Sequence, residues 1–229
     1  MKKPLILLSV ALCAASLVWA ESREDAAKRL HLASEVLTAI TTAPDKGIPL
    51  EVLDHARCIA VVPHMVKGGF IFGAQGGRGV ATCRTAHGWS APAFFTIAGG
   101  SWGLQIGVEG VDLVMIIQNE QGMNHLLSSK FQIGADASAA AGPVGRHASA
   151  DTDWKMNAEI LTYSRTKGVF AGLTLNGNAI TADKDTNKAV YGTDDTHAIL
   201  TGKVQPTPEG QAFIHSVHRA REAAAAAGM

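Results

Sequence analysis

The chain has 229 residues, and its 20 Lys and Arg are balanced by 20 Asp and Glu, so the formal net charge is zero. This balance argues against bulk nucleic-acid binding, which requires many phosphate charges to be neutralised. Hydrophobic residues make up 47% of the chain, enough at this length for one sizeable core. We therefore expect one domain with no nucleic-acid partner, and any contact with anionic lipid must come from a local patch.

Residues 1–20 are predicted to be a secretory signal peptide. Two lysines precede the mainly apolar run 5–18, and Ala20 is a small residue at the expected cleavage site. The run is too short to span a bilayer comfortably. Acylation of Cys13 is the disfavoured alternative, because the bulky Leu12 stands where a small residue is required. We expect residues 21–229 to form one exported domain, periplasmic or otherwise associated with a bacterial cell envelope.

Two cysteines, Cys58 and Cys83, remain after residue 20. An even number of cysteines in an exported chain suggests a disulfide. Both lie in apolar, strand-like segments, where a free buried cysteine is an equally ordinary finding. The sequence leaves both interpretations open.

The first predicted helix begins with Ser22 as its cap and ends before Pro44. Its apolar positions follow helical spacing: Ala26, Leu30, Ala33, Leu37 and Ile40. Its polar flank carries Lys28, Arg29 and His31. Such a helix could lie on a membrane, but its narrow apolar stripe and acidic start favour a surface helix packed on the core.

A short helix in Leu50–Ala56 is followed by apolar segments that glycines interrupt at short intervals up to Ile117. This punctuation predicts an antiparallel meander. We place its turns or interruptions at His64–Gly69, Gly76–Gly79, His87–Gly88 and Gly99–Gly100.

The segment Lys130–Arg146 predicts an unusual strand. Alternation places Ile133, Ala135, Ala137, Ala139 and Ala141 on one face. An alanine face packs only where another element approaches closely or where a ligand fills the gap. The sequence does not decide between the two.

The remaining segments complete an α+β fold. Gln121–Ser129 predicts a helix, Asn157–Ser164 and Val169–Leu175 predict strands, and Asn176–Asn178 predicts a type I′ hairpin turn. Helices are expected at Asp183–Tyr191, at Thr193–Leu200 and from Pro208 onward. The expected fold is a strongly bent, glycine-rich, mainly antiparallel and barrel-like sheet with helices at both ends of the chain.

Several strings in this order resemble the SYLF domain family, also named for a yeast actin-binding protein. The matching strings are Ile59–Pro63, Lys67–Phe70, Gly88–Pro92, Gly99–Gly107, Ser129–Phe131, Gly134–Asp136, Gly142–Arg146, Tyr163–Arg165, Lys167–Gly168 and Phe170–Gly172. The resemblance extends over about residues 48–204. It implies a non-enzymatic module that binds lipid, since eukaryotic members bind phosphoinositides and some bind actin. An exported bacterial chain ordinarily meets neither, so the implied ligand is a phospholipid, a membrane surface or another amphiphile.

Cations beside glycine-rich turns suit a phosphate-bearing head group, because backbone N–H groups can approach it closely. The candidates are Lys67, Lys130, Arg146, Arg165 and Lys167. Solvated charges at strand ends are the alternative interpretation of each of them.

Other functions have weaker support. Gly99–Gly103 matches the G-x-S-x-G pattern of a hydrolase with Ser101 as nucleophile, but a strand pattern follows where the motif requires a helix. His215 and His218 are one helical turn apart without a third spaced ligand, so no metal is expected. No cofactor is expected either. A protein-interaction or envelope-structural role is the main alternative to lipid binding.

Overall fold

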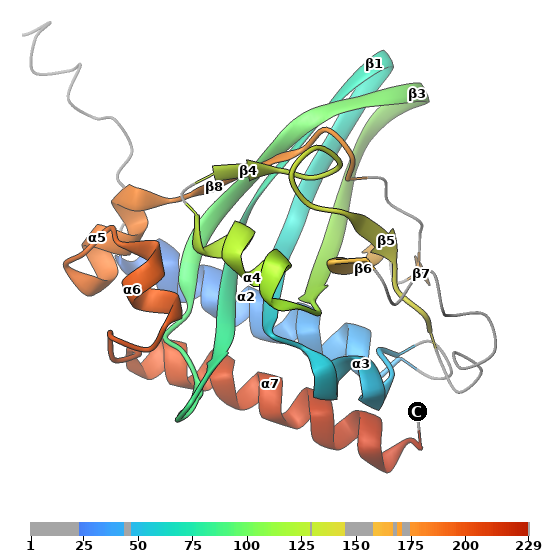
Figure 1. Cartoon of the computed structure of the whole chain (residues 1–229). Helices are drawn as coiled ribbons and strands as arrows, with labels where there is room; N and C mark the ends of the chain where they lie inside the picture. Colours follow the sequence, from blue (N-terminus) through green and yellow to red (C-terminus); the bar gives the residue numbers. More distant parts are fainter. Residues whose placement is uncertain are drawn as a thin grey trace, which may run out of the picture.

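The computed structural model describes residues 23–43, 47–128, 130–144, 158–166, 169–170 and 175–228. Figure 1 shows a strongly curled sheet that forms a half-barrel, with α2 and α7 lying along one side of it. The α+β class and the strongly bent sheet expected from the sequence are thereby confirmed. The predicted leader, residues 1–20, lies outside the described residues.

Four of the helices that the structure describes begin at a side chain that caps them. The helices are α2 (Arg23–Thr41), α3 (Leu50–His55), α4 (Glu120–Leu127), α5 (Lys184–Tyr191), α6 (Thr196–Leu200) and α7 (Pro208–Ala226). The side chains of Asn119, Asp183, Asp195 and Thr207 each accept a backbone N–H in the first turn of the following helix, which satisfies a donor that the helix leaves free. None of the helices in the described part of the chain has the length and hydropathy that a membrane crossing requires.

Two very long strands dominate the sheet. The strands are β1 (Cys58–Thr85), β2 (Gly88–Trp89), β3 (Ala93–Ile117), β4 (Lys130–Gln132), β5 (Ala139–Ala141), β6 (Ile160–Thr166), β7 (Val169–Phe170) and β8 (Ala179–Ala182). The main path is β2-β1-β3-β6-β5, while β8 pairs with β3 and β4, and β7 pairs with β6. The named strands pair antiparallel except for the parallel pair β5–β6.

The β1–β3 ribbon folds back on itself. A disulfide joins Cys58 and Cys83, two residues of the same strand that are 25 positions apart but only 4.0 Å apart at Cα. A straight strand would separate them by about 80 Å. The pairing of the ribbon shifts register between Val62 and Met65 and between Phe70 and Phe72, and irregularities of this kind let a strand bend. The two halves of β1 therefore lie against each other.

Glycines in β1 make this contact possible. A Cβ on Gly77 would lie 2.6 Å from Cγ1 of Val62, and one on Gly79 would lie 2.8 Å from the carbonyl oxygen of Val61. The turn predicted at Gly76–Gly79 is therefore wrong, because these glycines serve close packing inside a strand.

Two other predicted interruptions are also wrong. His64–Gly69 lies within β1, and Gly99–Gly100 lies within β3. The bulge in β1 is marked by His64, which has a positive φ of 49°. The turn at His87–Gly88 is confirmed, since it separates β1 from β2.

Alternation along the ribbon creates two cores. On one face, Ile59, Val61 and Val114 pack against α2 and α7. On the other face, Ala60 and Val62 pack inside the curl against residues of α4, α6, β4 and β8. Because neighbouring side chains point to opposite faces, nearly every residue at the base of the ribbon is buried.

Lys130–Arg146 does not form the single alanine-faced strand that alternation predicts. A turn at Gly134, where φ is +90°, separates β4 from β5. The carboxylate of Asp136 closes this turn by accepting the N–H of Gln132 at 2.7 Å. Ile133 and Ala137 are buried, whereas Ala135 and Ala141 are exposed. The predicted small-residue face therefore does not exist.

A turn at Asn176–Asn178 is confirmed, but the predicted hairpin is wrong, because β7 pairs with β6 whereas β8 pairs with β3 and β4. The predicted turn type is also wrong. A type I′ turn needs a positive φ at both central residues. Gly177 has a φ of +86°, while Asn176 is not among the residues with positive φ. Asn178 N–H donates to the carbonyl of Leu175 at 3.0 Å and closes the turn.

Replacing both cysteines of the disulfide should lower the free energy of unfolding by about 3–4 kcal/mol, because the crosslink closes a loop of 25 residues. Urea unfolding of Cys58→Ala/Cys83→Ala measures this change. Dithiothreitol should destabilise the wild type and leave the double variant unaffected. Equal midpoints for the oxidised wild type and the variant would contradict a stabilising role for the crosslink.

Candidate binding groove between α2 and α7

Helices α2 and α7 lie side by side on the outer face of the sheet (Figure 1). Small residues line their contact with each other and with the core: Ala26 and Ala33 of α2, and Ala220 and Ala224 of α7, are buried. Short side chains let the two helix backbones approach closely. The helices then leave a hollow between their outward flanks.

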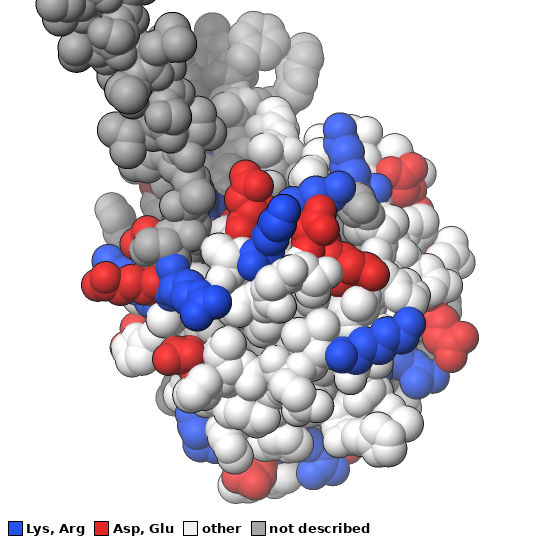
Figure 2. Space-filling model, turned by 90° about the vertical axis from the view of Figure 1, so that its left-hand side faces the viewer, with Lys and Arg blue, Asp and Glu red and all other residues white. Residues whose placement is uncertain are grey.

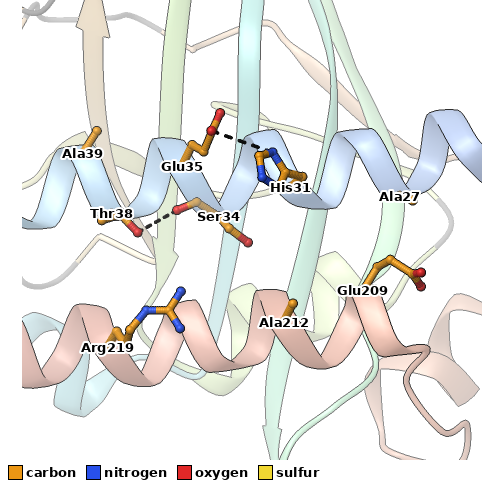
Figure 3. A pocket seen from close by; sticks show the side chains of 9 residues that line it. All are labelled: Ala27, His31, Ser34, Glu35, Thr38, Ala39, Glu209, Ala212 and Arg219. Atoms are coloured by element: carbon orange, nitrogen blue, oxygen red, sulfur yellow. Dashed lines mark hydrogen bonds and ion pairs between the residues drawn. The ribbon is translucent and has the colours of Figure 1, made fainter.

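This hollow is a groove of about 550 Å³. Ala27, Ser34, Thr38 and Ala39 of α2 and Ala212 of α7 line it. Ser34 and Thr38 lie on the side of α2 that faces α7, whereas Ala39 points away from α7 (Figure 3). Between Ala27 and Ala39 the groove follows α2 for about 18 Å, at 1.5 Å per helical residue. Its walls are therefore long, shallow and made of small side chains.

The two hydroxyl groups in the groove are already satisfied. Ser34 Oγ donates to the carbonyl of Leu30 at 3.0 Å, and Thr38 Oγ1 donates to the carbonyl of Ser34 at 2.8 Å. Back-bonded hydroxyls of this kind leave mainly hydrocarbon facing outward. The groove is therefore more apolar than its composition indicates.

Charged groups lie along the rim. His31 and Glu35 form an exposed pair on α2, with Nδ1 3.8 Å from Oε1. Glu209 lies in the first turn of α7, where the helix dipole favours a negative charge. The pKa of Tyr191 is raised mainly by burial and to a smaller extent by the nearby charge of Glu209. Arg219 lies further along α7 (Figure 3), and the described residues offer its guanidinium no ion-pair partner.

Arg29 holds α2 in place from the opposite side. It is only 5% exposed, and its Nη1 and Nη2 lie 3.2 and 3.1 Å from Oδ2 of Asp183. The guanidinium also lies 5.3 Å from the ring centroid of Phe94. Burial lowers the pKa of Arg29 to about 10 despite the opposing effect of Asp183, so the side chain stays charged at neutral pH. The sequence-based placement of Arg29 on the polar flank is wrong.

The ion pair also links α2 to α5. The other carboxylate oxygen of Asp183, Oδ1, accepts the N–H of Thr186 at 3.2 Å and caps α5. One carboxylate thus links two helices, and the guanidinium that it holds contacts Phe94 of the sheet beneath them. The orientation of the groove depends on this connection.

Three of the five cations selected from the sequence lie in the described part of the chain, and these three, Lys67, Lys130 and Arg165, do not form one cluster. Lys67 lies in β1 opposite Glu109 of β3. Arg165 lies in β6 opposite Asp112, with Nη2 3.8 Å from Oδ2. Glu109 and Asp112 are three positions apart in β3, so Lys67 and Arg165 point to opposite faces of the sheet.

Lys130 is exposed at the start of β4 and pairs with Thr181 of β8. It therefore lies on a different branch of the sheet from Lys67 in β1 and Arg165 in β6, whose strands both pair with β3. Arg146 and Lys167 lie outside the described residues. On the face shown in Figure 2, Lys and Arg are interspersed with Asp and Glu and form no single basic patch.

The residues considered for catalysis and metal binding are dispersed. Ser101 lies inside β3, which continues to Ile117, so the strand–turn–helix of a nucleophile elbow is not formed. His215 and His218 are both exposed on α7. No group of three or more potential metal-binding side chains occurs among the residues that the structure describes.

Sequence reasoning missed the groove itself. Its signal was the spacing of small residues on α2, since Ala27, Ser34 and Thr38 follow helical periodicity on a stripe separate from the core positions. The partner residue Ala212 is 185 positions from Ala27. Nothing in either local segment indicates that the two helices meet.

Comparisons with known proteins identify relatives. The family model described as "Ysc84: Las17-binding protein actin regulator" matches residues 98–220. The chain is similar to SH3 domain-containing YSC84-like protein 1 of Xenopus laevis, with 36% identity over 185 residues, 76% of this chain and 55% of that protein.

Two further relatives extend the same pattern. LAS seventeen-binding protein 3 of Saccharomyces cerevisiae is 34% identical over 182 residues, 77% of this chain and 39% of the yeast protein. The human SH3 domain-containing YSC84-like protein 1 is 33% identical over 168 residues, 72% of this chain and 48% of that protein. The chain thus spans about half the length of the curated relatives it matches, or less.

Replacing Arg29 with Met should lower the free energy of unfolding by about 3–5 kcal/mol, because Asp183 would keep a partly buried charge without its partner. Adding Asp183→Asn should restore most of the loss, since Asn removes that charge and still caps α5. Urea unfolding of both single variants and the double variant measures the coupling. A double variant no more stable than Arg29→Met would contradict it.

Proposed function

We propose that this chain, which belongs to the Ysc84 (SYLF) family, is a non-enzymatic module that binds the apolar chain of a phospholipid or another amphiphile in the α2–α7 groove. Family membership confirms the resemblance drawn from the sequence. The names of the relatives describe binding and regulation, which is consistent with a binding role for this chain.

The apolar character of the groove carries this proposal. A hydrocarbon chain gains about 25 cal/mol for each Å² of apolar surface it removes from water. Ser34 and Thr38 already donate to backbone carbonyls, so an apolar ligand would leave no hydroxyl without a partner. The walls of Ala27, Ala39 and Ala212 leave room beside the helices.

Arg219 supports an anionic head group at one end of the groove. Its guanidinium has no ion-pair partner among the described residues, and it can bind phosphate oxygens in a bidentate manner. Lys67 and Arg165 are less suited because acidic residues lie opposite both of them. Lys130, Arg146 and Lys167 remain as the second group of candidates for the head group.

A protein partner is the second candidate. The family description and the yeast relative's name both refer to binding of Las17 or LAS seventeen. A groove between two helices also accepts the apolar face of an amphipathic helix. A peptide helix and an acyl chain would compete for the same small-residue walls.

The location we propose is the bacterial cell envelope. The support is the sequence of residues 1–20, with two lysines before an apolar run and a small residue at position 20. In that compartment the Cys58–Cys83 disulfide would persist.

Filling the groove tests the function. Ala212 is exposed, so Ala212→Trp should fold normally and obstruct the groove. We expect binding to phosphatidylglycerol vesicles to fall at least about tenfold and a co-purified amphiphile to disappear from native mass spectra. Ala225→Trp is the matched control, because Ala225 is exposed on the same helix but does not line the groove.

The head-group assignment is tested separately. Arg219→Glu should weaken binding to phosphatidylglycerol vesicles and leave binding to phosphatidylcholine vesicles nearly unchanged, because only the former carry net negative charge. If Lys130→Glu/Arg146→Glu weakens binding and Arg219→Glu does not, the head group lies at the second set of cations. The lipid-binding function is contradicted if Ala212→Trp leaves vesicle binding unchanged and the wild type retains no amphiphile. In that case the protein-partner function would replace it.

A further inference from the structure

A second hollow of about 670 Å³ borders the other flank of α7. Its walls are the hairpin that joins β1 to β3, the segment between α6 and α7, and the α7 residues Gln211, Ile214 and His218. The α2–α7 groove uses Ala212 and Arg219 of the same helix. The two hollows are therefore distinct, and the proposed amphiphile site does not account for this one.

Among the described residues that line this polar pocket there is no Lys, Arg, Asp or Glu. A charged ligand would lose hydration there without gaining an opposite charge. Four side chains carry hydrogen-bonding nitrogen or oxygen atoms that no hydrogen bond within the described structure uses: His87, Gln205, Gln211 and His218. An uncharged ligand rich in hydroxyl groups matches these partners.

Apolar groups lie between the polar ones. Trp89, Val204, Pro206 and Ile214 also line the pocket. Sugars present hydroxyl groups around the ring edge and C–H groups on the ring faces, so they require both kinds of contact. Indole rings provide a broad, rigid apolar surface for such contacts.

The wall that carries Trp89 is held rigidly. Arg84 stacks on the indole with Cζ 4.8 Å from the ring centroid, and its Nε donates to the carbonyl of Ala56 at 2.8 Å. Thr82 Oγ1 donates to the carbonyl of Ser90 at 2.8 Å, which ties the two sides of the hairpin together. A site that is ordered before binding avoids the entropy cost of ordering it on contact.

From this lining we infer that the polar pocket between the β1–β3 hairpin and α7 binds a neutral saccharide. Binding without hydrolysis is expected, because glycoside hydrolysis ordinarily uses two carboxyl groups and none lines the pocket. This inference does not depend on the amphiphile function.

Saturation-transfer NMR and calorimetric titration of the full chain test it, with maltotriose and tri-N-acetylchitotriose as neutral probes and glucose 6-phosphate as the charged comparison. We expect at least one neutral probe to bind with a millimolar Kd, and Gln205→Ala/Gln211→Ala to raise this Kd about tenfold. His215→Ala, on α7 but outside the pocket, should leave it unchanged.

Three results would overturn the inference. They are no signal from either neutral probe at millimolar concentration, tighter binding of glucose 6-phosphate than of the neutral probes, and a Kd that the glutamine substitutions leave unaltered. Because the side chains of these two glutamines are exposed and make no hydrogen bonds within the described structure, the double variant should fold, which unchanged urea unfolding would verify. Ala212→Trp should leave saccharide binding intact, so failure of either proposal is distinguishable from failure of the other.

Discussion

The contact between the two halves of β1 is the constraint on which the rest of the structure depends. A straight ribbon as long as β1 and β3 would expose both faces to water. Folding it back gives an inner face that closes over its own side chains and an outer face that α2 and α7 cover. The glycines at 77 and 79 allow this approach, and the disulfide between Cys58 and Cys83 holds the two ends of β1 together.

The sequence predicted the helices well because their signals are local. Thr207 and Pro208 define the start of α7, and Asp183 defines the start of α5, whatever those helices later contact. Glycine in a strand is different, since it serves either a turn or a close approach of backbone. The string Gly76–Gly79 predicts a turn for this reason, but the atoms that exclude a Cβ at Gly77 and Gly79 belong to residues 61–65 and to Phe95, which are distant in the sequence.

The difference between local signals and distant contacts also explains why the observed groove differs from the predicted site. Charge can be read from the sequence, but the partner of a charge cannot. The sequence places Arg29 on the polar flank of its helix, whereas Asp183, 154 positions away, holds it in the interior. The sequence makes Arg165 a candidate for binding a head group but does not show that Asp112 lies opposite it in the neighbouring strand. The groove was missed because it belongs to two helices from opposite ends of the chain and to neither one alone.

Helix α7 then determines the position of both hollows. Its buried stripe includes Phe213, Val217 and Ala220, which recur at helical spacing and fix the rotation of the helix against the sheet. At 100° per residue, that rotation directs Ala212 and Arg219 toward α2 and directs Gln211 and His218 toward the β1–β3 hairpin. A substitution in the buried stripe of α7 would therefore disturb both hollows together. A substitution of a residue that lines only one hollow would affect that hollow alone. Two ligand chemistries can share a single helix in this way because its core contacts leave it only one orientation.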